Sequence, residues 1–404
     1  MHVTRLRLTN FRNYAALDLA LPPGLVVLWG ENAQGKTNLL EALFYLSTSR
    51  SPRTSRDAEL IGWHTPEGEA RFMRAEAAVQ RRDRTVTLDI TVMPRGGDAP
   101  TTAPAASDDA EVFVAAAPGA LKRIRVNGVP RRAIDLLGNA PVVFFRPEDV
   151  ELVTGAPAVR RRSIDILISQ LDPRYPRALQ RYGRAVTQRN ALLRRIAERA
   201  ATVDHLGPWD DLLVRDGAYL LHERLRVVAA LSEIAATAHE QLSGARDRLA
   251  MAYVPTACQA STEPAEAQIG EAFLQALASA RHRDLALGQT TVGPHRDDVA
   301  LLVNRAPAAD YASRGQQRTI ALAWRLAEAE YLRTASQEPP IVLLDDVLSE
   351  LDPRRRSAVL RAMAAFDQVI LTATEAVADA GTLHPAATFE VRHGTVMADD
   401  TAST

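Results

Sequence analysis

Eight consecutive residues place glycine, lysine and threonine at the spacing of a loop that binds phosphate. They match G-x-x-x-x-G-K-[ST] and are Gly30, Glu31, Asn32, Ala33, Gln34, Gly35, Lys36 and Thr37. In such a loop the glycines let backbone N–H groups surround phosphate oxygens, the lysine reaches the outer phosphates, and the threonine hydroxyl binds Mg²⁺. The pattern therefore predicts a site for a nucleoside triphosphate with Mg²⁺.

The lysine of this loop stands out because the chain otherwise uses arginine. Of the 48 basic residues, only Lys36 and Lys122 are lysines. A compact ammonium on a flexible stem reaches between phosphates, whereas a guanidinium is bulkier and fork-shaped. We interpret Lys36 as a position where phosphate chemistry overrides the chain's preference for arginine.

Two aspartates, Asp345 and Asp346, follow the apolar stretch Ile341 to Leu344. Adjacent carboxylates at the end of a buried strand are costly unless a cation lies beside them. Beside a phosphate loop, we expect Asp345 to bind Mg²⁺ and Asp346 to orient or deprotonate a water molecule. In isolation the same residues would be an ordinary strand end at the surface.

A second anion-binding end is predicted where Ser313, Gly315 and Gln316 precede an amphipathic helix expected over Arg318 to Leu332. The first N–H groups of a helix attract negative charge. A single nucleotide needs only one anion-binding helix start. In isolation, Ser313 would be a simple helix cap.

The elements around these motifs alternate between strand and helix at both ends of the chain. Two strands joined by a turn are expected over Val3 to Leu21, a buried strand over Leu25 to Trp29, and a helix from Asn38. Apolar strands also precede Asp345 and recur at Phe366 to Glu375. Mainly helical sequence lies between, so we expect one α/β core assembled from both ends of the chain, with a helical lobe inserted.

The helical lobe carries a local excess of basic residues. Between Glu151 and Ala200 there are eleven arginines and four acidic residues, while the whole chain has a net charge of −1. Such a run is often no more than a solvated helix face. If it binds nucleic acid, it would contact phosphates without reading bases.

The remaining composition predicts a protein of the cytoplasm. The single cysteine, Cys258, cannot form an internal disulfide, and no apolar stretch approaches the roughly 20 residues that span a bilayer. The first residues also lack an apolar run of signal-peptide length.

The order of the motifs resembles the ATP-binding-cassette class of ATPases. The phosphate loop is followed by Ser-x-Gly-Gln-Gln, the aspartate pair and then Ser349-Glu350-Leu351-Asp352. The N-terminal "LRLTNFRNY" is similar to the chromosome-maintenance branch of that class. Within this branch, "SRGQQRTIALA", "LLDDVLSELD", "GPHRDD" and "RPEDVELVTGAPAVRRRSID" resemble the RecF family of bacterial recombination mediators, over essentially the whole chain.

The resemblance implies an ABC-type ATPase head split between the two ends of the chain. Residues 1–155 would form its N-terminal part, with 94–110 as a mobile insertion, and 156–285 the helical lobe. Residues 286–404 would supply the signature motif at Ser313, the acidic motif (Walker B) at Asp345, and the D-loop at Asp352.

The resemblance also implies a mechanism. In an ATP-dependent homodimer, the segment Ser313 to Gln317 of one protomer would close on the γ-phosphate held by Lys36 of the other, with Asp352 communicating across the interface. Asp346, which is one methylene shorter than the glutamate of transporter-type relatives, implies a weak, DNA-stimulated ATPase that acts as a switch. Thr374 stands where those relatives have a switch histidine. The Arg146 to Asp149 turn is a candidate for the Mg²⁺-sensing glutamine segment.

The expected partners also follow from the resemblance. They are DNA at gaps or at junctions of single and double strands, and the RecO and RecR proteins, with which such a mediator loads recombinase. ATP and Mg²⁺ are the implied cofactors.

Other classes fit less well. A GTPase would need Asn-Lys-x-Asp, but Lys122 follows Leu121. The soluble ATPase subunit of another complex, such as a transporter, stays an alternative, disfavoured by the N-terminal strands and the large central lobe. A helical block of about 80 residues is too short for a chromosome-organising rod, and the 52 residues after Asp352 are too few for a nuclease domain.

Overall fold

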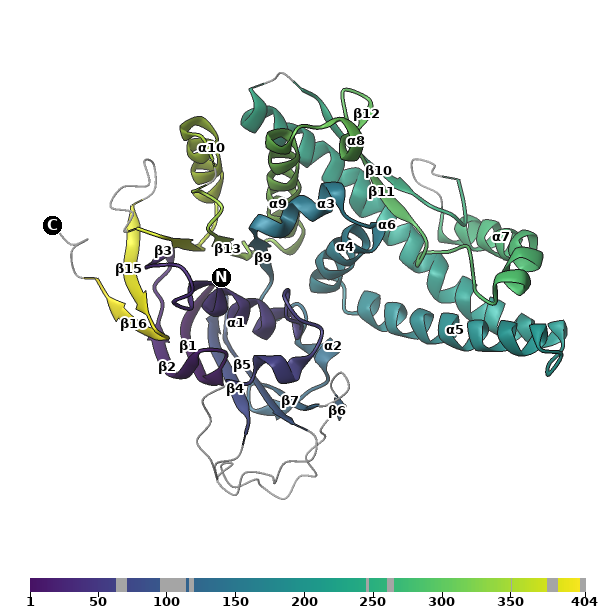
Figure 1. Cartoon of the computed structure of the whole chain (residues 1–404), viewed down its shortest axis with the longest axis horizontal. Coiled ribbons are helices and arrows are strands. Elements are labelled where there is room, and N and C mark those ends of the chain that lie inside the picture. The colour runs from purple at the N-terminus through teal and green to yellow at the C-terminus, as the bar shows by residue number, and fades with distance from the viewer. Residues whose placement is uncertain are drawn as a thin grey trace. The chain divides into compact units, whose positions relative to one another are not determined.

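The computed structural model describes residues 1–62, 71–94, 114–115, 120–244, 247–259, 265–349, 351–375 and 384–399. The chain divides into two compact units (Figure 1). The first combines Met1–Glu148 with Leu332–Thr404, and the second is Asp149–Tyr331. The predicted insertion at 94–110 lies outside the described residues except for Pro94.

The first unit contains a six-stranded sheet in the order β16-β15-β3-β14-β13-β9. Its strands are β3 (Gly24–Trp29), β9 (Val142–Phe145), β13 (Ile341–Asp345), β14 (Gln368–Ala373), β15 (Pro385–Arg392) and β16 (Thr395–Ala398). Strand β3, from the N-terminal part of the chain, is parallel to both β14 and β15 from the C-terminal part. The expectation of one core built from both ends of the chain is therefore confirmed.

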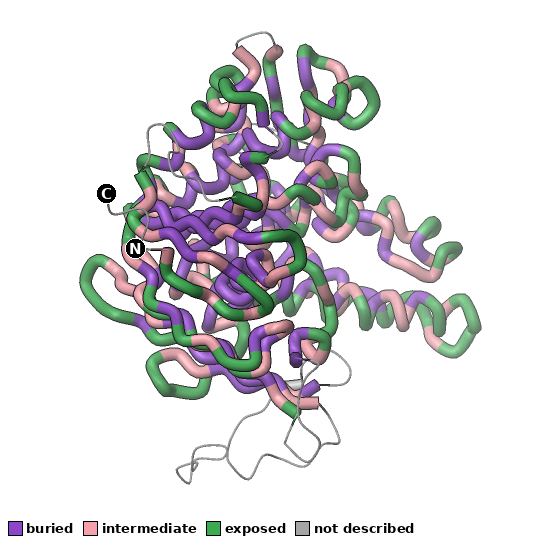
Figure 2. The backbone as a smooth tube through the Cα atoms, turned by 60° about the vertical axis from the view of Figure 1, so that its left-hand side comes forward, coloured by how far each residue is buried: buried purple, intermediate pink, exposed green. Residues whose placement is uncertain are grey.

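The four strands β3, β14, β13 and β9 are buried along nearly their whole length, as their apolar runs predict. Figure 2 draws such buried backbone in purple. Parallel strands end at the same edge of a sheet. The residues that follow β3 and β13 consequently meet, although they lie more than 300 positions apart in the sequence.

A second, antiparallel sheet of the first unit has the order β2-β1-β4-β5-β7-β6, with β8 added to β7. Its strands are β1 (His2–Phe11), β2 (Tyr14–Ala20), β4 (Met73–Gln80), β5 (Thr85–Pro94), β6 (Val114–Ala115), β7 (Ala120–Val126) and β8 (Val129–Pro130). The predicted N-terminal strand pair is confirmed as β1 and β2, joined by a tight turn where Phe11 pairs with Tyr14.

Helix α1 (Lys36–Thr48) contacts strands of both sheets, namely β4 and β5 of the antiparallel sheet and β9, β13 and β14 of the six-stranded sheet. Both lysines of the chain lie at its ends. Lys36 is its first residue, and the ammonium of Lys122, on β7, donates a 2.7 Å hydrogen bond to the carbonyl of Ser49, the C-cap residue. A cation at a helix C-terminus is favourable because the helix dipole is negative there. Short helices α2 (Ala133–Leu136) and η1 (Asp57–Leu60), and helix α10 (Pro353–Met363), complete the described helices lying wholly within this unit.

The second unit is mainly helical, as expected for the lobe. Its helices are α3 (Glu151–Thr154), α4 (Pro157–Leu171), α5 (Arg174–Ala197), η3 (Val203–Leu206), α6 (Gly207–Ser243), α7 (Glu266–Leu287), α8 (Ala308–Tyr311) and most of α9 (Arg314–Ser336), while η2 (Pro147–Val150) starts in the first unit. A small antiparallel sheet of β10 (Leu249–Val254), β11 (Asp298–Val303) and β12 (Ala306–Pro307) packs with α6.

The limits of this unit differ from the expected lobe of 156–285. The segment 286–331, expected in the ATPase head, belongs to the same compact unit as the lobe helices. Side chains of α9 explain this grouping. Arg325 makes two hydrogen bonds to Asp149, of 2.9 and 2.7 Å, and Glu328 accepts one from Ser163 at 2.6 Å.

Candidate nucleotide-binding site

The loop between β3 and α1 has the backbone that a phosphate loop requires. Gly30 and Gly35 have φ angles of 147° and 119°, in the region that favours glycine. A Cβ at Gly30 would lie 2.4 Å from the carbonyl oxygen of Val391, and one at Gly35 would lie 2.5 Å from the Asn13 amide nitrogen. Larger residues are therefore excluded at both positions by conformation and by space.

The Lys36 ammonium lies inside this loop. It donates hydrogen bonds to the carbonyl oxygens of Gly30 and, at 2.7 Å, of Glu31. Burial lowers its pKa, and the nearby carboxylates of Asp346 and Asp345 oppose that shift. An ammonium has three N–H donors, so one remains for a phosphate oxygen.

Thr37 and Asp345 are brought together as the sequence motifs predict. The Thr37 hydroxyl donates a 2.9 Å hydrogen bond to Oδ1 of Asp345, and the Thr372 hydroxyl donates another of 2.8 Å to the same oxygen. Burial raises the pKa of Asp345, these two bonds oppose the rise, and the charges of Glu148 and Asp346 add to it. A divalent cation would relieve this cost, because it favours the ionised carboxylate.

Asp346 is held by its backbone while one side-chain oxygen is left unused. Its φ angle is 49°, and its N–H donates a 2.9 Å hydrogen bond to the hydroxyl of Thr372. Its Oδ1 is buried without a hydrogen-bond partner among the described residues. A buried orphan acceptor is costly, and it fits a group that receives a hydrogen bond from a bound water.

Thr372 is a residue that the motifs did not reveal. It lies near the end of β14 and contacts both aspartates, since it donates to the side chain of Asp345 and accepts from the backbone of Asp346. The predicted strand over Phe366 to Glu375 was a signal for it. Polar residues that end a buried parallel strand next to β13 fall at the same edge as Asp345.

The outer side of the phosphate loop is braced by two turns. Asn13, between β1 and β2, donates a 2.9 Å hydrogen bond from its amide to the carbonyl of Gln34, and accepts one of 2.7 Å from Asn38. The N–H of Gly394, between β15 and β16, donates to the same carbonyl at 3.1 Å. The N–H of His393 donates to the Gln34 side chain at 2.8 Å. "LTNFRNY" therefore has a local structural role at the loop.

The predicted signature segment forms a capped helix start in the second unit. The N–H of Ser313 donates to Oε1 of Gln316 at 2.9 Å, and the N–H of Gln316 donates to the Ser313 hydroxyl at 3.3 Å. This reciprocal pair is a capping box. It starts α9 at Arg314, one turn before the expected Arg318, and leaves Ser313 and Gly315 exposed.

Three further predicted positions have distinct surroundings. Asp352 is the N-cap of α10 and accepts a 3.0 Å hydrogen bond from the N–H of Arg355. Thr374 is exposed just beyond β14. In the Arg146 to Asp149 turn, Asp149 is bound to Arg325, whereas the charge of Glu148 acts on Asp345.

Several arginines of the basic run are structural. Arg160 pairs with Asp298 through two hydrogen bonds of 2.7 and 2.9 Å, and the fully buried Arg189 pairs with Asp210 and Asp284, both at 2.7 Å. These cations are unavailable to a ligand.

Other arginines form an exposed stripe along α5. They are Arg177, Arg181, Arg184 and Arg195. Their spacing of four, three and eleven residues places them within about 60° of the helix circumference, over about 27 Å of its length. Asp216 pairs with Arg181 at 2.6 Å. Arg184 and Arg195 have no ion pair within the part of the chain that the structure describes.

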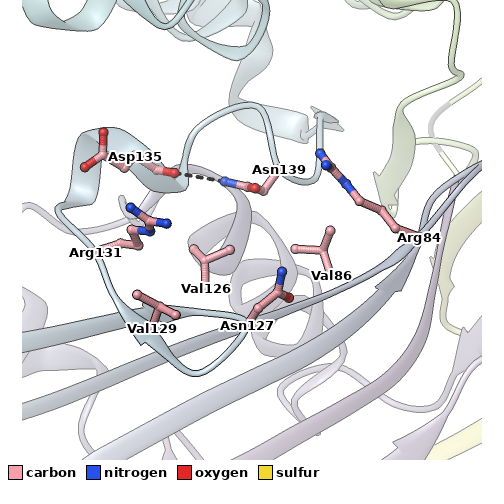
Figure 3. Close-up of a pocket in the computed structure, with 8 residues that line it drawn as sticks. All are labelled: Arg84, Val86, Val126, Asn127, Val129, Arg131, Asp135 and Asn139. Atoms are coloured by element: carbon pink, nitrogen blue, oxygen red, sulfur yellow. Dashed lines mark hydrogen bonds between the residues drawn. The ribbon is translucent and has the colours of Figure 1, made fainter.

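A cavity of about 390 Å³ lies away from these motifs, on the antiparallel sheet of the first unit (Figure 3). Arg84 and Arg131 stand on opposite sides of it, with Val86, Val126 and Val129 between them. None of its lining residues belongs to the phosphate loop or to the aspartate pair.

Neither a clustered metal site nor a membrane-spanning helix occurs in the described part of the chain. Its residues contain no group of three or more His, Cys, Asp or Glu side chains able to hold a metal ion. Within the same residues, none of the helices has the length and hydropathy needed to cross a membrane.

Comparisons with known proteins agree with this geometry. Residues 2–395 match the family model described as RecF/RecN/SMC N terminal domain. The chain is 44% identical to the DNA replication and repair protein RecF of Chloroflexus aurantiacus, covering 93% of this chain and 94% of that protein. It is 35% identical to RecF of Halalkalibacterium halodurans, covering 98% and 99%.

A solved structure described as the recombination mediator protein RecF-ATP in the RecFOR pathway superposes with a TM-score of 0.84. It shares 29% identity and covers 98% of this chain and 97% of that one. The motifs, the split ABC-type ATPase fold and these comparisons show that the chain belongs to the RecF family.

Proposed function

We propose that this protein is an ATP-dependent, DNA-binding recombination mediator that acts in the cytoplasm. The observation that carries the proposal is the contact between Thr37 of the phosphate loop and Asp345 of the acidic motif, with Lys36 beside them. Relatives named as DNA replication and repair proteins, and the similar solved complex of RecF with ATP, support the same function.

ATP and Mg²⁺ fit the residues of the first unit. The Thr37 hydroxyl and the Asp345 carboxylate offer two hard oxygen ligands, which suits Mg²⁺ because that ion usually takes one or two protein ligands and completes its shell with phosphates and waters. The backbone N–H groups of Ala33, Gln34 and Gly35 and the start of α1 would hold the phosphates, together with Gly30, Glu31 and Asn32. When bound, Mg²⁺ would neutralise charge on the β- and γ-phosphates.

Hydrolysis would use Lys36 and Asp346. Lys36 would hold the γ-phosphate, and the orphan Oδ1 of Asp346 would accept a hydrogen bond from the attacking water. Asp346 is shorter than glutamate and is fixed by Thr372, so its reach toward that water is limited. We propose a weak ATPase, stimulated by DNA, whose hydrolysis resets a conformational switch.

The second part of the site would come from another protomer. Ser313, Gly315 and Gln316 form an exposed helix start, with space around Gly315 for a close approach. In the proposed dimer this segment closes on the γ-phosphate held by Lys36 of the other copy. Asp352, which caps α10, would lie at the same interface.

DNA would be bound through phosphates by the arginine stripe of α5, at gaps or at junctions between single and double strands. Such contacts give sequence-independent binding that weakens steeply with salt. RecO and RecR are the proposed protein partners in loading recombinase, and they rest on the family membership alone.

Sedimentation velocity with Mg²⁺ and a slowly hydrolysed ATP analogue tests the dimer. We expect a nucleotide-dependent dimer for the natural sequence, loss of nucleotide binding for Lys36→Ala, and retained binding without dimer for Ser313→Arg. Gln275→Arg, at an exposed position of α7, is the matched control and should dimerise normally. An unchanged monomer in the natural protein, or a dimer of Ser313→Arg, would overturn the proposal.

A further inference from the structure

One carboxylate ties the signature segment to the residues just before β10. Asp247, in the connection from α6 to β10, accepts a 3.0 Å hydrogen bond from the Nε2 group of Gln316. The Oε1 of the same Gln316 accepts from the N–H of Ser313. Both ends of this amide are therefore engaged, which fixes its orientation beside Ser313.

Asp247 is itself held firmly. Its other carboxylate oxygen accepts a 2.9 Å hydrogen bond from the side-chain amide of Asn304, in the turn between β11 and β12. Asn304 also exchanges two hydrogen bonds with the backbone of Arg248, at 2.9 and 3.0 Å. A side chain anchored at one oxygen can position a partner at the other, because little rotamer freedom remains to be lost.

The hydrogen bond between Asp247 and Gln316 links two parts of the second unit that have separate roles in the proposed function. These are the helices that would bind DNA and the signature segment. Helix α6 packs against α5, which carries the arginine stripe, and also against β10, which starts two positions after Asp247. Gln316 lies in the first turn of α9 beside the exposed Ser313. A shift of α6 that moves β10 would reach Ser313 through Asp247 and Gln316, without passing through the phosphate loop.

We propose that Asp247 is a positioning residue for the signature segment, and that it couples DNA on the helices to ATP-dependent closure of the dimer. The inference rests on the proposed function. In this role, Asp247 would hold Ser313 in the conformation that the nucleotide site of a second protomer can contact. Nucleotide binding by one protomer does not depend on it.

Asp247→Ala tests the assignment. The variant removes a charge-assisted hydrogen bond, so we expect dimerisation with the ATP analogue to weaken by about tenfold. DNA should no longer strengthen that dimerisation, while affinity for a fluorescent ATP analogue stays within about twofold. Arg248→Gln, at the neighbouring exposed position, is the matched control and should leave all three measurements unchanged.

A second pair of substitutions exchanges the amide and the carboxylate between positions 247 and 316. It distinguishes a positioning role from general damage to the fold. Gln316→Glu places two carboxylates opposite each other and should weaken the dimer, whereas the added Asp247→Asn change supplies an amide donor and should restore most of it. Such a rescue is the coupling that a double-mutant cycle measures. Thermal unfolding of each variant serves as a check on folding.

The outcomes are distinct. Suppose that the natural protein dimerises with the ATP analogue and Ser313→Arg does not. If Asp247→Ala then dimerises as the natural protein does, the inference about Asp247 is wrong while the proposed function stands. Equal losses in the single and double variants, without rescue, would also contradict it. If the natural protein does not dimerise with nucleotide, the proposed function itself fails.

Discussion

The hydroxyl of Thr37 donates a 2.9 Å hydrogen bond to the carboxylate of Asp345, 308 positions later in the chain. The bond joins the first turn of α1 to the end of β13, and it exists because β3 and β13 run parallel in one sheet, with β14 between them. Two residues that would bind the same Mg²⁺ are thus already in contact.

Removal of the Thr37 hydroxyl should abolish the benefit of Mg²⁺ for nucleotide binding. Thr37→Ala deletes one ligand oxygen, and we expect affinity for ATP in the presence of Mg²⁺ to fall by about tenfold or more, toward the value measured with EDTA. Titration with a fluorescent ATP analogue, with and without Mg²⁺, measures the effect. Thr37→Ser keeps the hydroxyl and should retain most of the affinity. A full Mg²⁺ response in Thr37→Ala would exclude the assigned role.

Thr372 should matter for turnover more than for binding. Thr372→Val keeps the shape but removes the hydroxyl that holds Asp345 and Asp346, so we expect the rate of ATP hydrolysis to fall about tenfold while affinity changes less than about threefold. Thr372→Ser should preserve both. Steady-state hydrolysis and equilibrium binding separate the two effects, and a loss confined to binding would contradict the expectation.

The arginine stripe of α5 should account for part of the salt dependence of DNA binding. Replacement of Arg184 and Arg195 together by Gln removes two cations that lack ion pairs in the described structure, so the slope of log affinity against log salt should become shallower by about two. The control changes Arg84 and Arg131 to Gln. These exposed residues flank the cavity of Figure 3, and their replacement removes the same charge from the first unit. Equal slopes for both double variants would argue against a specific contact.

Lys122 should make stability depend on alkaline pH. Burial lowers its pKa from 10.5 to about 8, only partly offset by Asp57. Between these values the unfolded chain binds a proton that the folded chain does not, so stability rises as pH increases through this window. The gain is at most on the order of 3 kcal/mol.

Urea denaturation of the natural protein and of Lys122→Met at pH values of about 7.5, 8.5 and 9.5 isolates this effect. The stability of the natural protein relative to the variant should increase with pH. Asp83→Asn, at an exposed position of the same unit, should show no such trend relative to the natural protein. A constant difference between the natural protein and Lys122→Met would mean that Lys122 titrates alike in both states.

The motifs that predicted the fold correctly were local ones. The strand β3, the loop and α1 are consecutive, so their order could be recognised from apolar spacing and from Gly35, Lys36 and Thr37. The same holds for β13 and Asp345. Their meeting was also predictable, because parallel strands of one sheet present their carboxyl ends together.

Other features depended on partners far away in the chain. A run of arginines could not reveal that Arg160 and Arg189 are engaged by Asp298 and Asp284, because the pairing is set by tertiary packing. For the same reason the bond between Asp247 and Gln316 could not be predicted. Likewise, the packing of α9 with the lobe helices placed the signature segment outside the unit to which the sequence assigned it.

The two buried lysines at the ends of α1 also make the protein a selective substrate for proteolysis. A protease that cleaves only after lysine has two cut sites in all 404 residues, and both lysines are 7% exposed. Lys36 starts a helix and Lys122 lies within a paired strand, so cleavage requires the first unit to open. The second unit has no such site and would be released within the fragment 123–404. The rate of that cleavage therefore measures local opening of the nucleotide-binding unit alone, and a bound nucleotide should slow it.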